Sequence, residues 1–188
     1  MSFNFKKLEI PDLILIEPKV FSDERGFFME KYKKSDFENL GIPDFVQDNF
    51  SYSKKDVVRA LHYQISPHTQ GKLVTVIKGK IWDVAVDLRK DSEYFGKWVG
   101  VELSDENNLS FYIPPGFAHG FSVLSPEVYF LYKCTSEYDA SSERGIVCND
   151  PSLNIDWKVE NPIICDRDKN LPKFNQVEIL RKSDIISK

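Results

Sequence analysis

Three ionisable side chains on successive predicted strands suggest the chemistry of this sequence: His62, Lys72 and Asp83. Histidine ordinarily titrates near pH 6.5, so it is the side chain best suited to take up a proton near neutral pH. A lysine ammonium stabilises the negative charge of an enolate, which forms when a proton leaves a carbon next to a carbonyl group. A base beside a cation therefore indicates proton abstraction from such a carbon.

The predicted strand at residues 58–64 has two different faces. At a period of two, the apolar face holds Leu61, Tyr63 and Ile65. The opposite face holds Ala60, His62 and Gln64, and we interpret it as the floor of a cavity. Strict alternation puts Arg59 on the face opposite His62, so both residues serve one site only if the strand starts, bends or bulges near Arg59.

A hairpin is expected after this strand, with Lys78 and Gly79 as its two-residue loop. In that register Lys72 faces Ala85, and Lys72 and Asp83 become diagonal neighbours on one face, roughly 7–8 Å apart. We therefore expect the base, the ammonium and the carboxylate to meet in one sheet. Asp83 is interpreted as the structural counter-ion of Lys72.

The composition is that of a globular protein of one domain. The 188 residues are 41% hydrophobic and 29% charged, and one domain of this length buries a substantial core. The net charge is −4 and the pI is about 5.5, which argues against a nucleic-acid or anionic-membrane surface as partner. A local basic pocket for a small anionic molecule is compatible with these values.

Cysteine usage and the N-terminal segment indicate a soluble cytoplasmic protein. The three cysteines fit neither a metal-site spacing nor a disulfide framework, so reduced thiols are expected. The first residues lack the apolar core of a signal peptide, and no apolar run has the length of a membrane span.

Short strands separated by Gly and Pro turns predict an all-β fold with a few short helices. Residues 8–20 are expected to be extended, and a capping box from Ser35 to Glu38 predicts a short helix near 35–40. A strand or helix is expected near 176–181. We interpret the chain as a single cupin-like jelly roll (a double-stranded β-helix sandwich) over 1–188, with a weaker pattern at about 170–188.

The expected site is metal-free and cationic. Cupin metal sites often use a His-x-His pair, a Glu and a distant His. Here Gln64 takes the second position, and Lys72 lies where the acid is expected. Only His62 and His119 remain as plausible imidazole ligands, because His68 lies in a turn with Ser66 and Pro67. A lysine beside the metal would repel it, so no metal is predicted.

Several long segments in order resemble the dTDP-4-dehydrorhamnose 3,5-epimerase family, from about residue 8 to about residue 170. They are Arg59-Ala60-Leu61-His62-Tyr63-Gln64, Gln70-Gly71-Lys72-Leu73-Val74, Asp83-Val84-Ala85-Val86-Asp87-Leu88-Arg89, Phe95-Gly96-Lys97-Trp98, Ile113-Pro114-Pro115-Gly116-Phe117-Ala118-His119-Gly120-Phe121 and Asn149-Asp150-Pro151. The resemblance implies a jelly-roll isomerase of dTDP-L-rhamnose biosynthesis, needing no cofactor and usually homodimeric. Its reaction inverts C3 and C5 of dTDP-4-dehydro-6-deoxy-D-glucose through an enolate at the C4 ketone.

The resemblance also implies roles for individual residues. His62 resembles the general base, Asp168 its carboxylate partner, Lys72 the group that stabilises the enolate, and Tyr132 the acid that reprotonates from the opposite face. The positions that resemble substrate contacts are Arg25, Glu30, Gln47, Asp48, Asn49, Arg59, His119, Tyr138, Glu143 and Arg167. Arginines among them suit the diphosphate of a nucleotide sugar.

Three positions depart from the family pattern. Ala60 replaces a usual glycine, Cys148 stands where a tryptophan is common, and Arg167 stands where a lysine is common. None belongs to the proton-transfer set.

Our hypothesis is therefore a cofactor-independent epimerase of a nucleotide-linked 4-keto-6-deoxyhexose. The alternatives are an epimerase or isomerase that inverts one centre, a non-catalytic sugar-nucleotide binding protein, and a metal-dependent cupin oxygenase. Gln64 and Lys72 disfavour the oxygenase.

Overall fold

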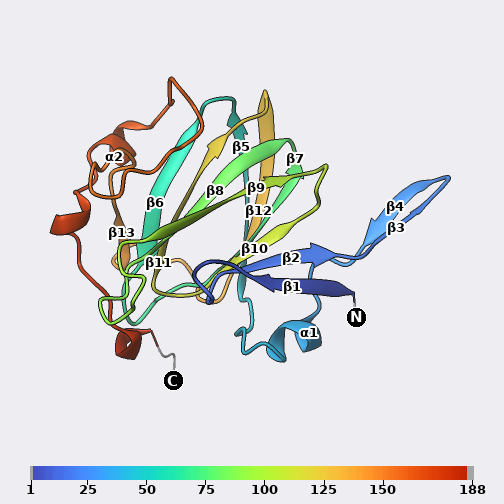
Figure 1. The fold of residues 1–188 in the computed structure, drawn as a ribbon, viewed down its shortest axis with the longest axis horizontal. Coiled ribbons are helices and arrows are strands. Elements are labelled where there is room, and N and C mark those ends of the chain that lie inside the picture. The colour runs from blue at the N-terminus through green and yellow to red at the C-terminus, as the bar shows by residue number, and fades with distance from the viewer. Residues whose placement is uncertain (1, 186–188) are drawn as a thin grey trace.

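The computed structural model describes residues 2–185, which form two antiparallel sheets packed face to face (Figure 1). The six-stranded sheet has the order β1-β2-β10-β7-β12-β5, the five-stranded sheet the order β13-β6-β11-β8-β9, and β3 and β4 form a separate hairpin. The strands are β1 (Phe3–Lys7), β2 (Ile14–Pro18), β3 (Val20–Asp23), β4 (Gly26–Met29), β5 (Gln47–Lys54), β6 (Val58–Gln64), β7 (Lys72–Lys78), β8 (Lys80–Asp87), β9 (Trp98–Ser104), β10 (Ser110–Ile113), β11 (Phe117–Val123), β12 (Glu127–Cys134) and β13 (Glu143–Gly145).

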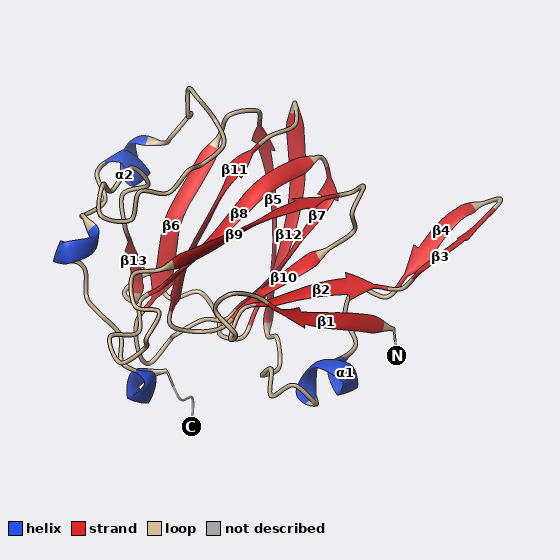
Figure 2. Cartoon of the chain, viewed as in Figure 1, coloured by secondary structure: helices blue, strands red, loops and turns tan. Residues whose placement is uncertain are grey.

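Helices are few and short, as Figure 2 shows. They are the α-helices α1 (Lys34–Glu38) and α2 (Asp166–Lys169), and the 3₁₀ helices η1 (Phe174–Gln176) and η2 (Lys182–Asp184). The predicted all-β sandwich of the jelly-roll type is confirmed. No helix within residues 2–185 is long and apolar enough to cross a membrane.

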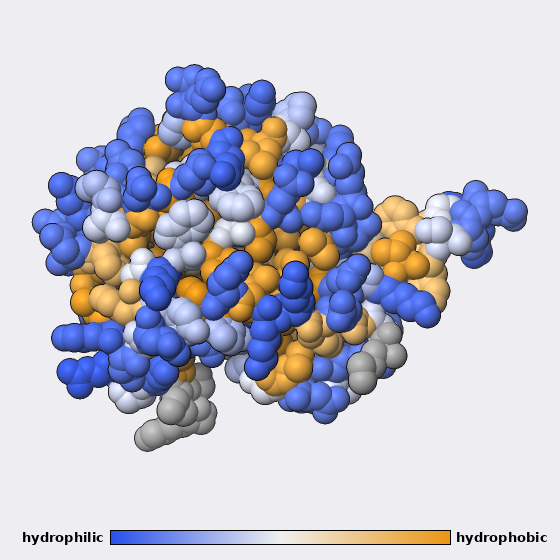
Figure 3. All heavy atoms as spheres, in the orientation of Figure 1, coloured by the Kyte–Doolittle hydropathy of each residue, from blue (hydrophilic) through white to orange (hydrophobic). Residues whose placement is uncertain are grey.

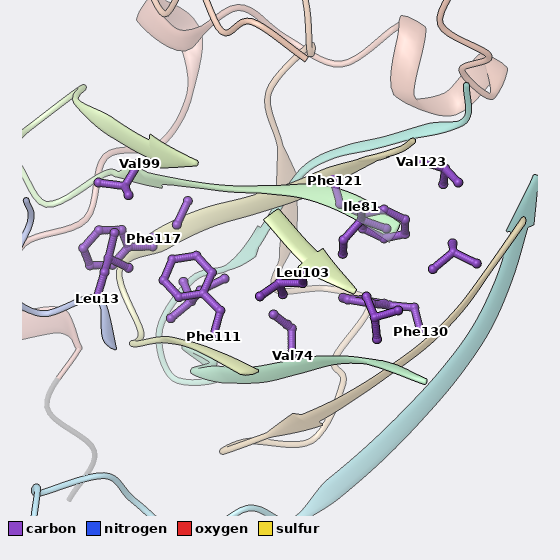
Figure 4. Close-up of a cluster of buried hydrophobic side chains, with 14 of the residues drawn as sticks. Leu13, Val74, Ile81, Val99, Leu103, Phe111, Phe117, Phe121, Val123 and Phe130 are labelled. Carbon is purple, nitrogen blue, oxygen red and sulfur yellow. The ribbon is translucent and has the colours of Figure 1, made fainter. Parts of the chain in front are cut away.

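The main core lies between the two sheets (Figure 4). Phe111 and Phe130 point inward from the six-stranded sheet, and Ile81, Leu103 and Phe117 point inward from the five-stranded sheet. Alternation along each strand supplies one inward side chain in two, so both sheets contribute to one apolar layer. This layer holds the sheets apart at a fixed spacing.

Two further apolar clusters cover outer faces of the sheets. The C-terminal part of the chain packs on the outside of the five-stranded sheet, where Leu61 and Val84 meet Ile146, Leu153 and Trp157. This packing brings α2 beside β6, although about a hundred residues separate them in the sequence (Figure 1). On the six-stranded sheet, α1 is held by its buried Phe37 within an aromatic cluster.

The expected hairpin of β7 with β8 is wrong, because the two strands belong to different sheets. β7 pairs with β10 and β12, and β8 pairs with β11 and β9. Gly79 has φ +92°, a left-handed conformation that favours glycine, and the chain crosses there from one sheet to the other. Lys72 and Asp83 therefore belong to facing sheets and are not diagonal neighbours in one.

Three local predictions are also corrected. Residues 8–13, predicted to be extended, form a turn closed by the hydrogen bond from Leu8 N to Leu13 O. Pro11 has no N–H to donate to a neighbouring strand, so a strand does not continue through it. Helix α1 begins at Lys34 and has no side-chain cap, so Ser35 lies inside it and forms no capping box. The strand or helix expected near 176–181 is only partly present: the 3₁₀ helix η1 ends at Gln176, and residues 177–181 contain only the bridge between Arg89 and Leu180.

The hairpin of β3 and β4 projects from the body of the sandwich (Figure 1). Its aromatic side chains are exposed: Phe21 by 49%, Phe27 by 63% and Phe28 by 65%. Figure 3 shows apolar atoms near the base of this arm and hydrophilic atoms at its tip. An exposed apolar arm of this kind is typical of a protein-protein contact.

Lys31 anchors the base of this arm, and its titration should be visible in the stability of the protein. Its Nζ donates a 2.9 Å hydrogen bond to the carbonyl of Asn108, and burial lowers its pKa to about 8. Between pH 8 and the ordinary value of 10.5, the unfolded chain holds a proton that the folded chain has lost, so the free energy of unfolding rises with pH. We expect this rise, about 1–2 kcal/mol between pH 8 and 10, to vanish in Lys31→Met. Urea unfolding of both proteins across this range measures it, and parallel curves would contradict it.

Candidate active site

One cavity of about 460 Å³ opens between the sheets, and side chains from both sheets line it. Lys72 and Tyr132 come from the six-stranded sheet, and His62 and His119 come from the five-stranded sheet. The C-terminal segment that packs beside β6 supplies Asp168 at the wall. The predicted site residues that line the cavity are Arg59, His62, Lys72, His119, Tyr132, Tyr138, Glu143, Arg167 and Asp168.

His62 and Asp168 form a hydrogen-bonded pair in this wall. His62 Nε2 lies 2.9 Å from Asp168 Oδ1, and the Asp168 side chain is only 3% exposed. Burial alone would raise the pKa of Asp168, but the hydrogen bond from His62 and the charge of Arg167 hold it below its ordinary value. A carboxylate at Nε2 fixes the tautomer with its proton on that nitrogen and leaves Nδ1 as the basic nitrogen.

The bulge predicted near Arg59 is present between β6 and β11. His119 pairs with His62 and Phe121 pairs with Arg59, so two β6 residues lie opposite Gly120 alone. A Cβ at Gly120 would lie 2.5 Å from the Cβ of Ala60, which explains the small residues at this point. The bulge lets Arg59 and His62 line the same cavity despite their odd spacing. Ala60, predicted for the cavity floor, is instead buried in the cluster outside the sheet.

Lys72 and Tyr132 form the facing wall of the cavity. Lys72 lies opposite Cys134 in the β7–β12 pair, and its Nζ is 6.0 Å from the centre of the Tyr132 ring. Burial lowers the pKa of Lys72, against the opposing charges of Cys134, Asp83 and Glu143. Burial also raises the pKa of Tyr132, which keeps the phenol protonated at neutral pH. This wall therefore offers an amine and a protonated phenol.

Asp83 has His119 as its direct partner, which corrects its interpretation as the counter-ion of Lys72. Its two carboxylate oxygens lie 3.0 and 2.9 Å from His119 Nε2, and the aspartate is fully buried. Asp83 and Lys72 face each other from different sheets, and Asp83 still opposes the lowering of the lysine pKa at longer range. Burial lowers the pKa of His119. Two His–Asp pairs thus lie at the cavity: His62 and Asp168 both line it, whereas His119 lines it and Asp83 is buried behind His119.

Three further residues form the rim of the cavity. Glu143 accepts a 2.9 Å hydrogen bond from the Tyr138 hydroxyl and two hydrogen bonds, of 3.3 and 3.2 Å, from Arg167 Nη1. The Tyr138 side chain is exposed, so its ring can contact a ligand at the entrance. A rim with an aromatic ring and charged groups suits a nucleotide.

Five predicted contact residues lie outside the lining of this chain's cavity. Gln47 and Asn49 share the inner face of β5 but do not line the cavity. Gln47 accepts a hydrogen bond from Tyr138 N, and Asn49 donates one to Cys134 Sγ. Alternation puts Asp48 on the opposite face, where it binds Lys133. Arg25 and Glu30 lie with the projecting hairpin, and the exposed Arg25 binds Asp23.

Other lining residues were not predicted as site residues: Ser51, Val57, Val58, Tyr63, Gln64, Gln70, Phe121, Ile163, Ile164 and Cys165. Strand alternation was the signal that could have identified two of them: Gln64 shares a face with His62, and Ser51 shares a face with Asn49. The residues at 163–165 gave no local signal, because only the tertiary path of the C-terminal segment brings them to the cavity. Ile163 is held there by backbone hydrogen bonds with Asp56 and Val58.

Among residues 2–185, no group of three or more His, Cys, Asp or Glu side chains is arranged to hold a metal ion. The absence of a metal from the reaction stays a prediction.

This arrangement suits proton transfer on two faces of one bound molecule. A histidine with a carboxylate partner lies on one sheet, and a protonated phenol with an amine lies on the facing sheet. A ring of hexose size bound between the walls has one face toward the base and the other toward the phenol. Removal of a proton on one side and its return on the other inverts the carbon.

Comparison with known proteins points to one family. Residues 7–176 match the family model described as dTDP-4-dehydrorhamnose 3,5-epimerase. The enzyme of that name from Shigella flexneri is 55% identical over 173 residues, with 91% of this chain and 96% of that protein covered. The enzyme of that name from Pseudomonas aeruginosa is 52% identical, with 89% and 94% covered.

A solved structure agrees with these relatives. The crystal structure of dTDP-6-deoxy-D-glucose-3,5-epimerase from Legionella pneumophila, in complex with dTDP-4-keto-L-rhamnose, superimposes with a TM-score of 0.92. It is 49% identical in sequence, with 95% of this chain and 98% of that chain covered.

Proposed function

The chain belongs to the dTDP-4-dehydrorhamnose 3,5-epimerase family, and we propose that His62, Lys72 and Tyr132 carry out the reaction of that family in its cavity. The protein is accordingly an isomerase, which inverts C3 and C5 of dTDP-4-dehydro-6-deoxy-D-glucose in dTDP-L-rhamnose biosynthesis. The observation that carries the mechanism is the placement of His62 with Asp168 on one sheet and Tyr132 with Lys72 on the facing sheet.

Proton removal is assigned to His62. The carboxylate of Asp168 stabilises the imidazolium that forms when Nδ1 takes the proton from the carbon next to the ketone. The C4 ketone activates both neighbouring carbons, so one base serves C3 and C5 if the sugar shifts between the two steps. General-base catalysis of this kind contributes about 10²–10⁴-fold to the rate.

Tyr132 is assigned the return of the proton, and its removal should separate exchange from inversion. In Tyr132→Phe the base is intact, so we expect proton removal to continue while inversion falls by about 10²–10⁴-fold. His62 would exchange the abstracted proton with solvent and return a deuteron to the same face. NMR of the sugar in D₂O should therefore show deuterium without inversion, whereas the wild-type protein should give inverted product with deuterium at both C3 and C5.

Tyr129→Phe is the matched control, because Tyr129 lies on the same strand but contacts Phe50 and Tyr52 outside the cavity. It should behave like the wild-type protein. Equal loss of exchange and inversion in Tyr132→Phe would mean that the phenol does not act as the proton donor.

The nucleotide-sugar substrate is assigned to the same cavity, with Tyr138 and Arg59 toward the nucleotide. Arg59 donates a 3.0 Å hydrogen bond from Nε to Ser53 and a 3.3 Å hydrogen bond from Nη2 to Tyr52 O. These bonds leave its Nη1 edge for a diphosphate oxygen. His119 Nδ1, opposite the nitrogen that binds Asp83, is assigned to a polar group of the sugar.

Homodimerisation is supported by the projecting hairpin. It carries Arg25 and exposes phenylalanine side chains away from this chain's own cavity. In a homodimer, the hairpin of one protomer would bring Arg25 and Glu30 to the cavity of its partner. A cytoplasmic location fits the three unpaired cysteines.

A further inference from the structure

Arg167 directs the Nε and Nη1 groups of its guanidinium to carboxylates of this protein. Nε lies 3.2 Å from Asp168 Oδ1, Nη1 donates to both carboxylate oxygens of Glu143, and Nη2 lies 3.2 Å from His62 Nε2. A guanidinium has five N–H donors, and these contacts occupy its edge toward the protein. The donors that remain for a ligand are those of Nη2, beside His62.

We infer that Arg167 is a positioning residue for the His62–Asp168 pair and not a contact of the diphosphate. Asp168 Oδ1 is the atom shared between His62 and Arg167, so the guanidinium fixes the carboxylate in the orientation that the imidazole needs. This inference rests on the proposed function, because it assumes that His62 is the base.

The secondary structure around Asp168 explains why a tether is needed. Helix α2 spans four residues, has no side-chain cap, and leads into residues 170–173, which form no regular element. So short a helix does not hold its shape by its own hydrogen bonds. Arg167 ties α2 to β13 through Glu143, and the carboxylate of Asp168, which Arg167 also holds, ties α2 to β6 through His62, so three elements are fixed around one carboxylate.

Glu143 balances the charge that Arg167 brings to the base. A guanidinium 3.2 Å from His62 opposes the positive charge that the imidazole gains when it takes a proton. Glu143 pairs with Arg167 from the other side and offsets this repulsion. Asp168 and Glu143 together supply two negative charges against one from Arg167 and one from the protonated His62. The cluster is therefore neutral at the stage at which the substrate carries the enolate.

Substitution of Arg167 separates positioning from substrate binding. We expect Arg167→Gln to lower kcat by about tenfold or more, because a displacement of the base by a fraction of an ångström is already costly. KM and the Kd of dTDP should stay within about twofold of the wild-type values. Arg167→Lys keeps the charge and a donor for each carboxylate, so its kcat should recover to within about threefold of wild type.

Arg144→Gln is the matched control. Arg144 is the neighbour of Glu143 on β13, has a partner carboxylate in Glu178 at 3.6 Å, and does not line the cavity. It should leave kcat, KM and dTDP binding unchanged. Thermal unfolding of each variant shows whether it is folded.

The charge balance is tested by a double-mutant cycle. Glu143→Gln leaves Asp168 as the only carboxylate of the cluster against Arg167 and the protonated His62, so it should lower kcat more than Arg167→Gln does. Removing both groups should raise kcat above that of Glu143→Gln, by about tenfold, because the unbalanced cation is gone. Independent sites would instead give the product of the two single losses.

Four results would overturn the inference. The first is a rise of tenfold or more in KM and in the dTDP Kd of Arg167→Gln with an unchanged kcat, and the second is no change in kcat, KM or Kd in that variant. The third is a kcat of Arg167→Lys that does not recover, and the fourth is independent losses of kcat in the double-mutant cycle. The first would return Arg167 to the role of a substrate contact. Failure of the proposed function is seen separately, because His62→Asn would then keep full activity whatever Arg167 does.

Discussion

His62→Asn should lower kcat by about 10⁴-fold and abolish deuterium uptake at both C3 and C5. Both proton removals use the same imidazole, so the loss is expected at the upper end of the range for general acid–base catalysis. Asparagine is close to histidine in size and can still donate a hydrogen bond to Asp168, which lies 2.9 Å from His62 Nε2. The cavity and its buried carboxylate are thus preserved while the basic nitrogen is removed. The measurement is NMR of the sugar in D₂O, together with the Kd of dTDP by calorimetry.

The change in dTDP affinity should be less than about threefold, because His62 is assigned to the sugar and not to the nucleotide. His68→Asn is the matched control, since His68 follows the turn at Ser66 and Pro67 and does not line the cavity. Deuterium uptake by His62→Asn at the wild-type rate would remove His62 from the role of base. Uptake at one carbon alone would assign the other carbon to a different group.

Lys72→Met should lower kcat/KM by about 10³-fold. A unit charge about 4 Å from the enolate oxygen contributes about 4 kcal/mol at an effective dielectric constant near 20. This corresponds to about three orders of magnitude in rate. Methionine keeps an unbranched chain against the Tyr132 ring, from which the ammonium lies 6.0 Å, and removes only the charge and its donors. Steady-state kinetics with the dTDP-4-keto sugar measures the effect.

Lys78→Met is the matched control for this variant. Lys78 ends the same strand and lies 5.8 Å from the ring of Tyr129, but it is exposed and pairs with Glu127 outside the cavity. It should leave the kinetics unchanged. A higher KM with an unchanged kcat in Lys72→Met would place the ammonium on the ground state of the substrate and not on the enolate.

Part of the β6 wall of the site could be predicted from local sequence because strand alternation is a local property, whereas the residues of β12, β13 and α2 were predicted from the family resemblance alone. Leu61 and His62 are adjacent on β6, and alternation correctly put Leu61 on a buried face and His62 on the cavity wall. The odd spacing of Arg59 and His62 also indicated a bulge, and the pairing shifts at that point. The Gly79 turn was recognised as well, but its sequence does not say whether the chain stays in one sheet or crosses to the other.

The partner of Asp83 was the clearest error, and its cause is this crossing. With β7 and β8 in one hairpin, Asp83 would lie beside Lys72; with the strands in facing sheets, β11 becomes the neighbour of β8. The residue of β11 that pairs with Asp83 is Phe121, two positions from His119. The side chains of Asp83 and His119 nevertheless meet through buried hydrogen bonds of 2.9 and 3.0 Å. Sheet membership thus decided which imidazole the carboxylate binds.

The sequence by itself determined the all-β class, the turns and the family, and it supplied the proposal that His62, Lys72 and Tyr132 are the base, the cation and the proton donor. These follow from alternation, from Gly and Pro chemistry and from long motifs, all of which are read within short segments. The tertiary structure alone decided which strands share a sheet, how Arg167 joins Glu143 to Asp168, and where the hairpin with Arg25 points. Such contacts join residues far apart in the chain, and they form only when burial of apolar surface across the whole sandwich fixes its topology.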